Sequence, residues 1–179
     1  TLEQKFGPGE PNLKAPNFHR PIEASPVLKE ISDLAIKASE KIRSDEFKAL
    51  STSNLKIVTA TTDVHEYGKR LLEEILTLID LEIIDGGVST DPKSLAAIAV
   101  HGDAIFLSTY NGIALDFLET LHEELAKQKN NVPVFIGGKL NQVLTSSNSE
   151  LSVDVTNELI NKGTIVCKNL EGFYAPLAE

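Results

Sequence analysis

Residues 60–68 read Ala-Thr-Thr-Asp-Val-His-Glu-Tyr-Gly and combine side chains that can hold a metal. Asp63 stands two residues before His65, so its carboxylate can accept the proton of one ring nitrogen while the other nitrogen faces a metal. Gly68 leaves the backbone bare where a bulky group could lie against it. The pattern alone is weak, and taken by itself it is better explained by a helix-capping Asp beside an exposed His.

The segments on either side of this stretch predict a turn between a strand and a helix. Residues 55–60 are a short apolar run, and residues 69–79 carry apolar side chains at helical spacing. Short apolar runs continue to alternate with amphipathic runs along the chain, which indicates a parallel sheet with crossover helices. Besides the strand at 55–60, we predict strands at 81–85, 104–107, 132–136 and 164–167, and helices at 65–79, 91–100, 113–129 and 152–161.

Five strands alternating with helices predict an α/β fold, a flavodoxin-like doubly wound parallel sheet in the order 2-1-3-4-5. Ligands of such sheets bind beyond the carboxyl ends of the strands, where the strand order reverses. The turns after strands 1, 3 and 4 should therefore face one crevice. The first turn contains residues 63–68, and the other two contain Ser108, Thr109, Tyr110, Asn111, Gly112, Gly137 and Gly138.

The chain before this domain differs in composition. Residues 1–25 are rich in proline and predict an extended arm or linker. Residues 26–50 predict one additional helix, which begins at Ser25 and Pro26 with proline at the first helical position. The α/β domain is then expected to cover residues 53–179.

Composition restricts the partners and the compartment. The formal net charge of −9 over 179 residues provides no basic face, so we expect no nucleic-acid partner. A single cysteine, Cys167, permits no internal disulfide and favours a reducing compartment. No apolar run is long enough to cross a bilayer. We therefore expect a soluble, cytoplasmic protein without a membrane partner.

Taken together, the three turns resemble the Asp-x-His-x-x-Gly, Ser-x-Leu and Gly-Gly signature of cobalamin-binding domains, found in adenosylcobalamin mutases and corrinoid methyltransferases. The motifs occur in order and at spacings close to those of the family, over about residues 54–166. The sequence departs from the signature twice. Tyr110 stands in place of leucine, and residues 167–169, Cys-Lys-Asn, replace the Pro-Gly-Thr that many relatives carry.

The resemblance implies that cobalamin binds with its own dimethylbenzimidazole displaced from cobalt. His65 would coordinate cobalt from the lower face, and Asp63 would hold the other imidazole nitrogen. Ser108 would donate a hydrogen bond to the displaced base, which would enter a slot between strands 1 and 3. Gly137 and Gly138 would let the tail lie against bare backbone. The same resemblance implies that the cofactor also lies against Val64, Glu66, Tyr67, Gly68, Leu72, Thr109, Tyr110 and Gly112.

Residues 108–112, with an aromatic residue followed by glycine, also resemble the small subunit of glutamate mutase. This favours the cobalamin-binding part of an adenosylcobalamin-dependent mutase, which needs a partner TIM barrel to perform a radical 1,2-rearrangement. Two alternatives stay open. One is the corrinoid protein of a methyltransferase system, carrying methylcobalamin, although such proteins usually have a four-helix bundle ahead of the domain. The other is a cobalamin shuttle or sensor without turnover.

Other functional interpretations of these turns fail on single residues. A phosphate-binding loop around Gly137 and Gly138 would need Ser or Thr where Leu140 stands. A phosphoacceptor domain of this topology would need an aspartate at the end of strand 3, where Ser108 stands.

Overall fold

The computed structural model describes residues 26–44, 54–143 and 152–168. The predicted arm (residues 1–25), the end of the predicted first helix (residues 45–50) and residue 169 lie outside the described residues. In the described part, no helix is both long enough and apolar enough to span a membrane. The elements are α2 (Pro26–Ser44), β1 (Lys56–Thr61), α3 (Tyr67–Leu78), β2 (Glu82–Asp85), α4 (Pro92–Ala99), β3 (Ala104–Thr109), α5 (Ala114–Lys127), β4 (Val134–Gly138), β5 (Asn141–Gln142), β6 (Val153–Asp154), α6 (Thr156–Asn161) and β7 (Ile165–Val166).

The five main strands form a parallel sheet in the order β2-β1-β3-β4-β7, which confirms the predicted flavodoxin-like order. The chain reverses its direction of travel across the sheet between β1 and β3, which are neighbours. The carboxyl ends of β1, β3 and β4 lie side by side, because Thr61 of β1 pairs with Ser108 of β3 and Ser108 pairs with Gly137 of β4. The sheet therefore brings the predicted site residues of three strands to one edge.

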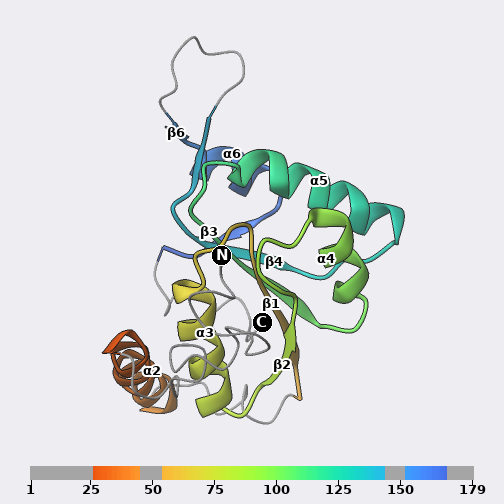
Figure 1. The fold of residues 1–179 in the computed structure, drawn as a ribbon. Coiled ribbons are helices and arrows are strands. Elements are labelled where there is room, and N and C mark those ends of the chain that lie inside the picture. The colour runs from red at the N-terminus through yellow and green to blue at the C-terminus, as the bar shows by residue number, and fades with distance from the viewer. Residues whose placement is uncertain (1–25, 45–53, 144–151, 169–179) are drawn as a thin grey trace, which may run out of the picture.

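Helices cover both faces of the sheet, with α3 and α2 on one side and α4, α5 and α6 on the other (Figure 1). Successive residues of a strand point to opposite faces. On β3, Phe106 therefore packs toward α3 while Ile105 and Leu107 pack toward α4 and α5. Phe106 stacks on Phe135 of β4 with ring centroids 6.1 Å apart. The two apolar layers hold the sheet rigid behind its carboxyl edge.

The N-terminal helix α2 belongs to the first of these layers. Ile31 is 1% exposed and Ala35 is fully buried, and both join the cluster formed by α3 and the sheet. The Tyr67 hydroxyl at the start of α3 donates a hydrogen bond to Glu30 at 3.0 Å. The α2 helix is thus packed onto the domain.

Two strands extend beyond their predicted ends. β3 continues through Ser108 to Thr109, and β4 continues to Gly138, because Thr109 pairs with Gly138 and the Lys139 N–H donates to the Thr109 carbonyl at 2.8 Å. Ser108 and Gly137 therefore lie on strands and not in the turns after them. Paired backbone holds their positions more firmly than a turn would.

The predicted helix at 152–161 is wrong at its start. Val153 and Asp154 form β6, which pairs antiparallel with β5, and α6 begins only at Thr156. The Asp154 carboxylate accepts the Thr156 N–H at 2.8 Å, so a local hydrogen bond sets the beginning of the helix. Strands of two residues, like β5 and β6, carry too short a pattern to be predicted.

Candidate cofactor-binding site

Asp63 and His65 form a pair in the loop that joins β1 to α3. One carboxylate oxygen of Asp63, Oδ1, lies 2.9 Å from the His65 Nδ1 and accepts the His65 backbone N–H at 2.7 Å. An ionised carboxylate can only accept hydrogen bonds, so Nδ1 carries the proton and the Nε2 lone pair is available. Asp63 is 7% exposed, whereas the His65 side chain is 65% exposed. The pair thus presents one oriented nitrogen ligand at the surface.

The second oxygen of Asp63 is held by the residue that follows β3. Oδ2 accepts the backbone N–H of Tyr110 at 2.7 Å, across the boundary between β1 and β3. The neighbouring Thr62 hydroxyl lies 2.7 Å from that of Thr109, and the Asn111 amide donates to the Thr62 carbonyl at 3.3 Å. The Thr62 N–H also donates to the Ser108 carbonyl at 3.0 Å. These bonds tie the β1 loop to the end of β3 and keep the carboxylate in place.

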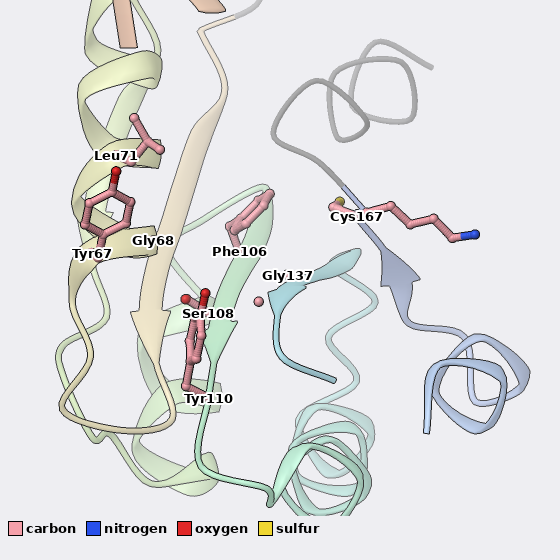
Figure 2. A pocket seen from close by; sticks show the side chains of 10 residues that line it. Tyr67, Gly68, Leu71, Phe106, Ser108, Tyr110, Gly137 and Cys167 are labelled. Carbon is pink, nitrogen blue, oxygen red and sulfur yellow. The ribbon is translucent and has the colours of Figure 1, made fainter. Parts of the chain in front are cut away.

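A cavity of about 300 Å³ opens beside this loop, between the start of α3 and the ends of β3, β4 and β7 (Figure 2). This volume lies at the lower end of the range for ligand sites, which is about 300–1,000 Å³. Its walls are mostly apolar, with the Ser108 hydroxyl among them and Lys168 as the one charged residue. The lining residues are Tyr67, Gly68, Leu71, Phe106, Ser108, Tyr110, Gly137, Gly138, Cys167 and Lys168.

Three glycines around the cavity differ in what a side chain would meet. A Cβ on Gly68 would lie 2.7 Å from the Ser108 Oγ, so a side chain there would displace the Ser108 hydroxyl. Gly138 has φ +105°, and a Cβ there would collide with the Thr109 backbone. At Gly137 the nearest atoms would be the Cys167 carbonyl oxygen at 3.6 Å and a Phe106 ring carbon at 4.0 Å, which are ordinary contacts. A Cβ on Gly137 would take space in the cavity without straining the fold.

A cluster of opposite charges lies beside the site, where α3 meets β2. The Lys69 ammonium, on a residue 6% exposed, lies 2.6 Å from a Glu73 oxygen and 2.9 Å from an Asp85 oxygen. Burial alone would lower the pKa of Lys69, but its hydrogen bonds to the two carboxylates outweigh this and raise it. The hydrogen bond from Lys69, and then that from the Gly87 N–H, lower the pKa of Asp85. The cluster fastens the first turn of α3 to the sheet.

Burial and hydrogen bonding also shift the pKa values of two side chains that line the cavity. Desolvation raises the pKa of the Cys167 thiol to about 12, so the thiol is protonated at neutral pH. Desolvation, followed by the hydrogen bond to Glu30, raises the pKa of the Tyr67 phenol. Both side chains therefore line the cavity in their uncharged forms.

Comparison with known proteins yields likenesses of sequence and of structure. No family model matches the chain. The chain is 33% identical over 81 residues to glutamate mutase sigma subunit 1 of Haloarcula marismortui, a match that covers 44% of this chain and 54% of that protein. The chain thus spans about half the length of this curated relative.

Two solved structures share the fold. The first is a cobalamin-binding protein from Desulfitobacterium hafniense, with a TM-score of 0.58 and 19% identity, covering 82% of this chain and 69% of that one. The second is the methanol:cobalamin methyltransferase complex of Methanosarcina barkeri, with a TM-score of 0.55 and 10% identity, covering 83% of this chain and 65% of that one. The chain has the fold of the cobalamin-binding domain family.

Within this fold, the predicted site residues occupy several kinds of position. Tyr67, Gly68, Ser108, Tyr110, Gly137 and Gly138 line the cavity. Val64 is 74% exposed beside His65, and Glu66 forms an ion pair with Arg70 at 3.4 Å. Thr109 is buried behind the cavity wall, and Gly112 lies in the turn after β3 near Val143. The structure places both Leu71 and Leu72 in the hydrophobic core cluster, and of the two Leu71 also lines the cavity.

Sequence reasoning missed four residues that line the cavity of this fold: Leu71, Phe106, Cys167 and Lys168. Leu71 and Phe106 have the same apolar character as core residues, so no local signal separates them. Cys167 and Lys168 stand where the family carries Pro-Gly-Thr. Their place in that motif is the feature of the sequence that could have identified them as cavity residues. The hydrogen bonds between Thr62 and Asn111 were not predicted either, because they form between segments that are far apart in the sequence.

Proposed function

We propose that this chain binds cobalamin with the lower base displaced and with His65 as the lower axial ligand of cobalt. The observation that supports this most strongly is the Asp63–His65 pair, which presents Nε2 at the surface from a fixed imidazole. His65 supplies a single nitrogen, which suits a metal whose equatorial positions are filled by a macrocycle. The hydrogen bond from Nδ1 to Asp63 sets the tautomer and makes Nε2 a better ligand.

The cavity beside His65 fits the displaced nucleotide tail. Phe106 and Leu71 give a flat aromatic base apolar walls, and the Ser108 hydroxyl can donate to its ring nitrogen. Such a hydrogen bond contributes about 1 kcal/mol net. Gly137 supports placing the tail in this cavity. The protein itself leaves room for a Cβ at this position, so glycine there suits a ligand that occupies the space. Lys168 at the cavity can pair with the phosphate of the tail.

We further propose that the chain serves an adenosylcobalamin-dependent mutase. The likeness to the sigma subunit of glutamate mutase supports this class. Bound adenosylcobalamin would supply a cobalt–carbon bond whose cleavage starts a radical 1,2-rearrangement. The role of this chain is to orient the cofactor from below with His65 and to hold its tail. A partner TIM barrel would bind substrate above the corrin.

The likeness to the methanol:cobalamin methyltransferase complex supports a second candidate, a corrinoid protein that carries a methyl group between enzymes. A shuttle or sensor is the third. Incubation with adenosylcobalamin or methylcobalamin, followed by identification of the protein that co-purifies, separates the three. A barrel protein with rearrangement activity supports the mutase, and methyl transfer to a thiol or thioether acceptor supports the methyltransferase.

The coordination itself is tested by electron paramagnetic resonance of cob(II)alamin bound to protein labelled with nitrogen-15 in histidine. Nitrogen-15 has spin one half, so an imidazole on cobalt is expected to split each cobalt line in two. His65→Ala should remove this splitting. His101→Ala, which changes an exposed histidine at the opposite edge of the sheet, is the matched control and should keep it. A three-line nitrogen splitting in the labelled protein would mean that the cofactor keeps its own base and would refute the proposal.

A further inference from the structure

Tyr110 contacts both members of the Asp63–His65 pair. Its backbone N–H donates to Asp63 Oδ2 at 2.7 Å, the oxygen opposite the one that faces the imidazole. Its ring lies against His65, with ring centroids 5.9 Å apart and planes inclined by 40°. A hydrogen bond at Nδ1 fixes only one corner of the imidazole, so a neighbour on its face is needed to set the tilt of the ring.

Tyr110 also lines the cavity, together with Ser108 and Gly137 (Figure 2). Its ring is therefore shared between the cavity and the imidazole. The backbone beneath it is held on both sides, since Thr109 is fully buried in β3 and Asn111 donates to the Thr62 carbonyl. The side chain itself is 51% exposed, so it can move while its backbone stays in place. A group that fills the cavity would therefore contact this ring.

We propose that Tyr110 is a positioning residue that couples occupancy of the cavity to the orientation of His65. The inference rests on the proposed function, in which the cavity takes the nucleotide tail and His65 takes cobalt. A tail in the cavity restricts the Tyr110 ring, and the ring in turn restricts the tilt of the imidazole. The leucine that the family signature carries at this position has no flat face to provide the same restriction.

The coupling can be measured without cobalt. The probe is α-ribazole, the nucleoside that carries dimethylbenzimidazole, added to the full chain while nuclear magnetic resonance follows the His65 ring signals. In the wild type, α-ribazole is expected to shift the His65 ring resonances and to strengthen the cross-relaxation between the His65 and Tyr110 rings. Tyr110→Phe keeps the flat ring and should keep this response. Tyr110→Leu and Tyr110→Ala should reduce the shift to less than about half of the wild-type value.

A second measurement uses cob(II)alamin. A distribution of imidazole tilts broadens the cobalt lines, so Tyr110→Leu is expected to give broader lines than the wild type, while Tyr110→Phe restores their width. Ile160→Ala is the matched control, because Ile160 is also 51% exposed but lies on α6. It should leave both the α-ribazole response and the line width unchanged.

The outcomes separate this inference from the function on which it rests. Unchanged His65 shifts and line widths in Tyr110→Leu and Tyr110→Ala, with the nitrogen-15 splitting present, would overturn the coupling and leave the cobalt ligation intact. Absence of α-ribazole shifts at His65 in the wild type, with the splitting present, would overturn it in the same way. Absence of the splitting in the wild type would overturn the proposed function itself.

Discussion

Gly137 and Gly138 are neighbours on β4, yet different atoms lie where their side chains would be. Gly138 has φ +105° and faces the Thr109 backbone, so the protein itself requires glycine there. Gly137 has ordinary contacts at 3.6 and 4.0 Å, and its free side lines the cavity. The two positions thus separate a requirement of the fold from a requirement of the site.

Substitution of each glycine by alanine should therefore have opposite effects. Gly138→Ala is expected to lower the free energy of unfolding by about 1–3 kcal/mol, because alanine must adopt a strained backbone conformation. Gly137→Ala should change that free energy by less than about 1 kcal/mol. It should nevertheless weaken cobalamin binding by about 1–3 kcal/mol, because the added methyl group overfills the cavity.

Urea unfolding measures the first quantity and quenching of tyrosine emission measures the second. The chain has three tyrosines and no tryptophan, and Tyr67 and Tyr110 line the cavity, so tyrosine emission reports on its occupancy. Equal affinity of Gly137→Ala and the wild type would contradict the placement of the tail.

The residues with unusual chemistry at the site could be predicted from the sequence, and the apolar ones could not. Asp63, His65 and Ser108 stand in a recognisable pattern at the ends of predicted strands. Phe106 and Leu71 alternate with core residues exactly as a buried strand or helix requires, so only the three-dimensional arrangement shows which of them faces the cavity. Leu72, which the resemblance assigns to the cofactor, lies in the core.

At the scale of elements, α3 is held at its first turn by charge and along its length by apolar contacts. Lys69 joins Glu73 of the same helix to Asp85 at the end of β2. The Glu73 carboxylate also accepts the Thr59 hydroxyl of β1 at 2.5 Å. The helix that borders the cavity is thus tied to two strands near the site.

Acid should weaken the ion pair between Lys69 and Asp85 and so lower the stability of the fold. The pKa of Asp85 is lowered in the folded protein, chiefly by the hydrogen bond from Lys69. Its contribution to stability is therefore present above the unfolded pKa of about 3.9 and is lost as the pH falls through the lower folded value. The loss should stay below about 1 kcal/mol, because the Asp85 side chain is 73% exposed.

Urea unfolding between about pH 6 and pH 3 measures this contribution. Asp85→Asn should lose less stability over that interval than the wild type. In a double-mutant cycle with Lys69→Met, the acid-dependent part should appear as a coupling between the two residues. Additive effects at both pH values would show that the pair is not coupled.

The packing of α2 leads to a third prediction. Ile31→Ala is expected to lower the free energy of unfolding by about 2–4 kcal/mol, because Ile31 is 1% exposed in the cluster it shares with α3. Leu34→Ala, on the same helix but 39% exposed, is the control and should cost less than about 1 kcal/mol. Similar small effects of both variants would mean that α2 is a separate appendage.

Element types were predictable where a segment was long enough to show its period. The five main strands and their order follow from the alternation of apolar and amphipathic runs. The β5–β6 pair could not be predicted, because a strand of two residues shows no periodicity in the sequence. Val153 was placed in a predicted helix for the same reason. The ends of β3 and β4 were misplaced because their last pairs, between Ser108 and Gly137 and between Thr109 and Gly138, depend on contact between strands.

At the scale of the whole molecule, the Asp63–His65 pair and the cavity lie at one edge of the sheet. Their contacts in the described residues come from β1, β3, β4, β7 and α3 and from the loops that follow these strands. Glu30 is the contributor from outside this set, through Tyr67. A chain that begins at residue 26 keeps every contact named above for the site, so it should bind cobalamin within about twofold of the full chain.

The same truncation tests a role for the arm in assembly with a partner barrel. If the arm contacts that barrel, its deletion should weaken co-purification while the affinity for cobalamin, followed by tyrosine emission, stays the same. Unchanged co-purification would remove the arm from the interface. A large loss of cobalamin affinity would instead place the arm at the cofactor.

The burial of Cys167 has a practical consequence. The chain has one cysteine, and it is 7% exposed with its thiol pKa raised to about 12, so maleimide reagents at neutral pH should leave it unmodified. A cysteine introduced at Gln128, an exposed position after α5 at the far edge of the sheet, would then react alone. Biotin attached there would fix every molecule to a sensor chip in one orientation, with the cavity-bearing edge toward the flowing sample.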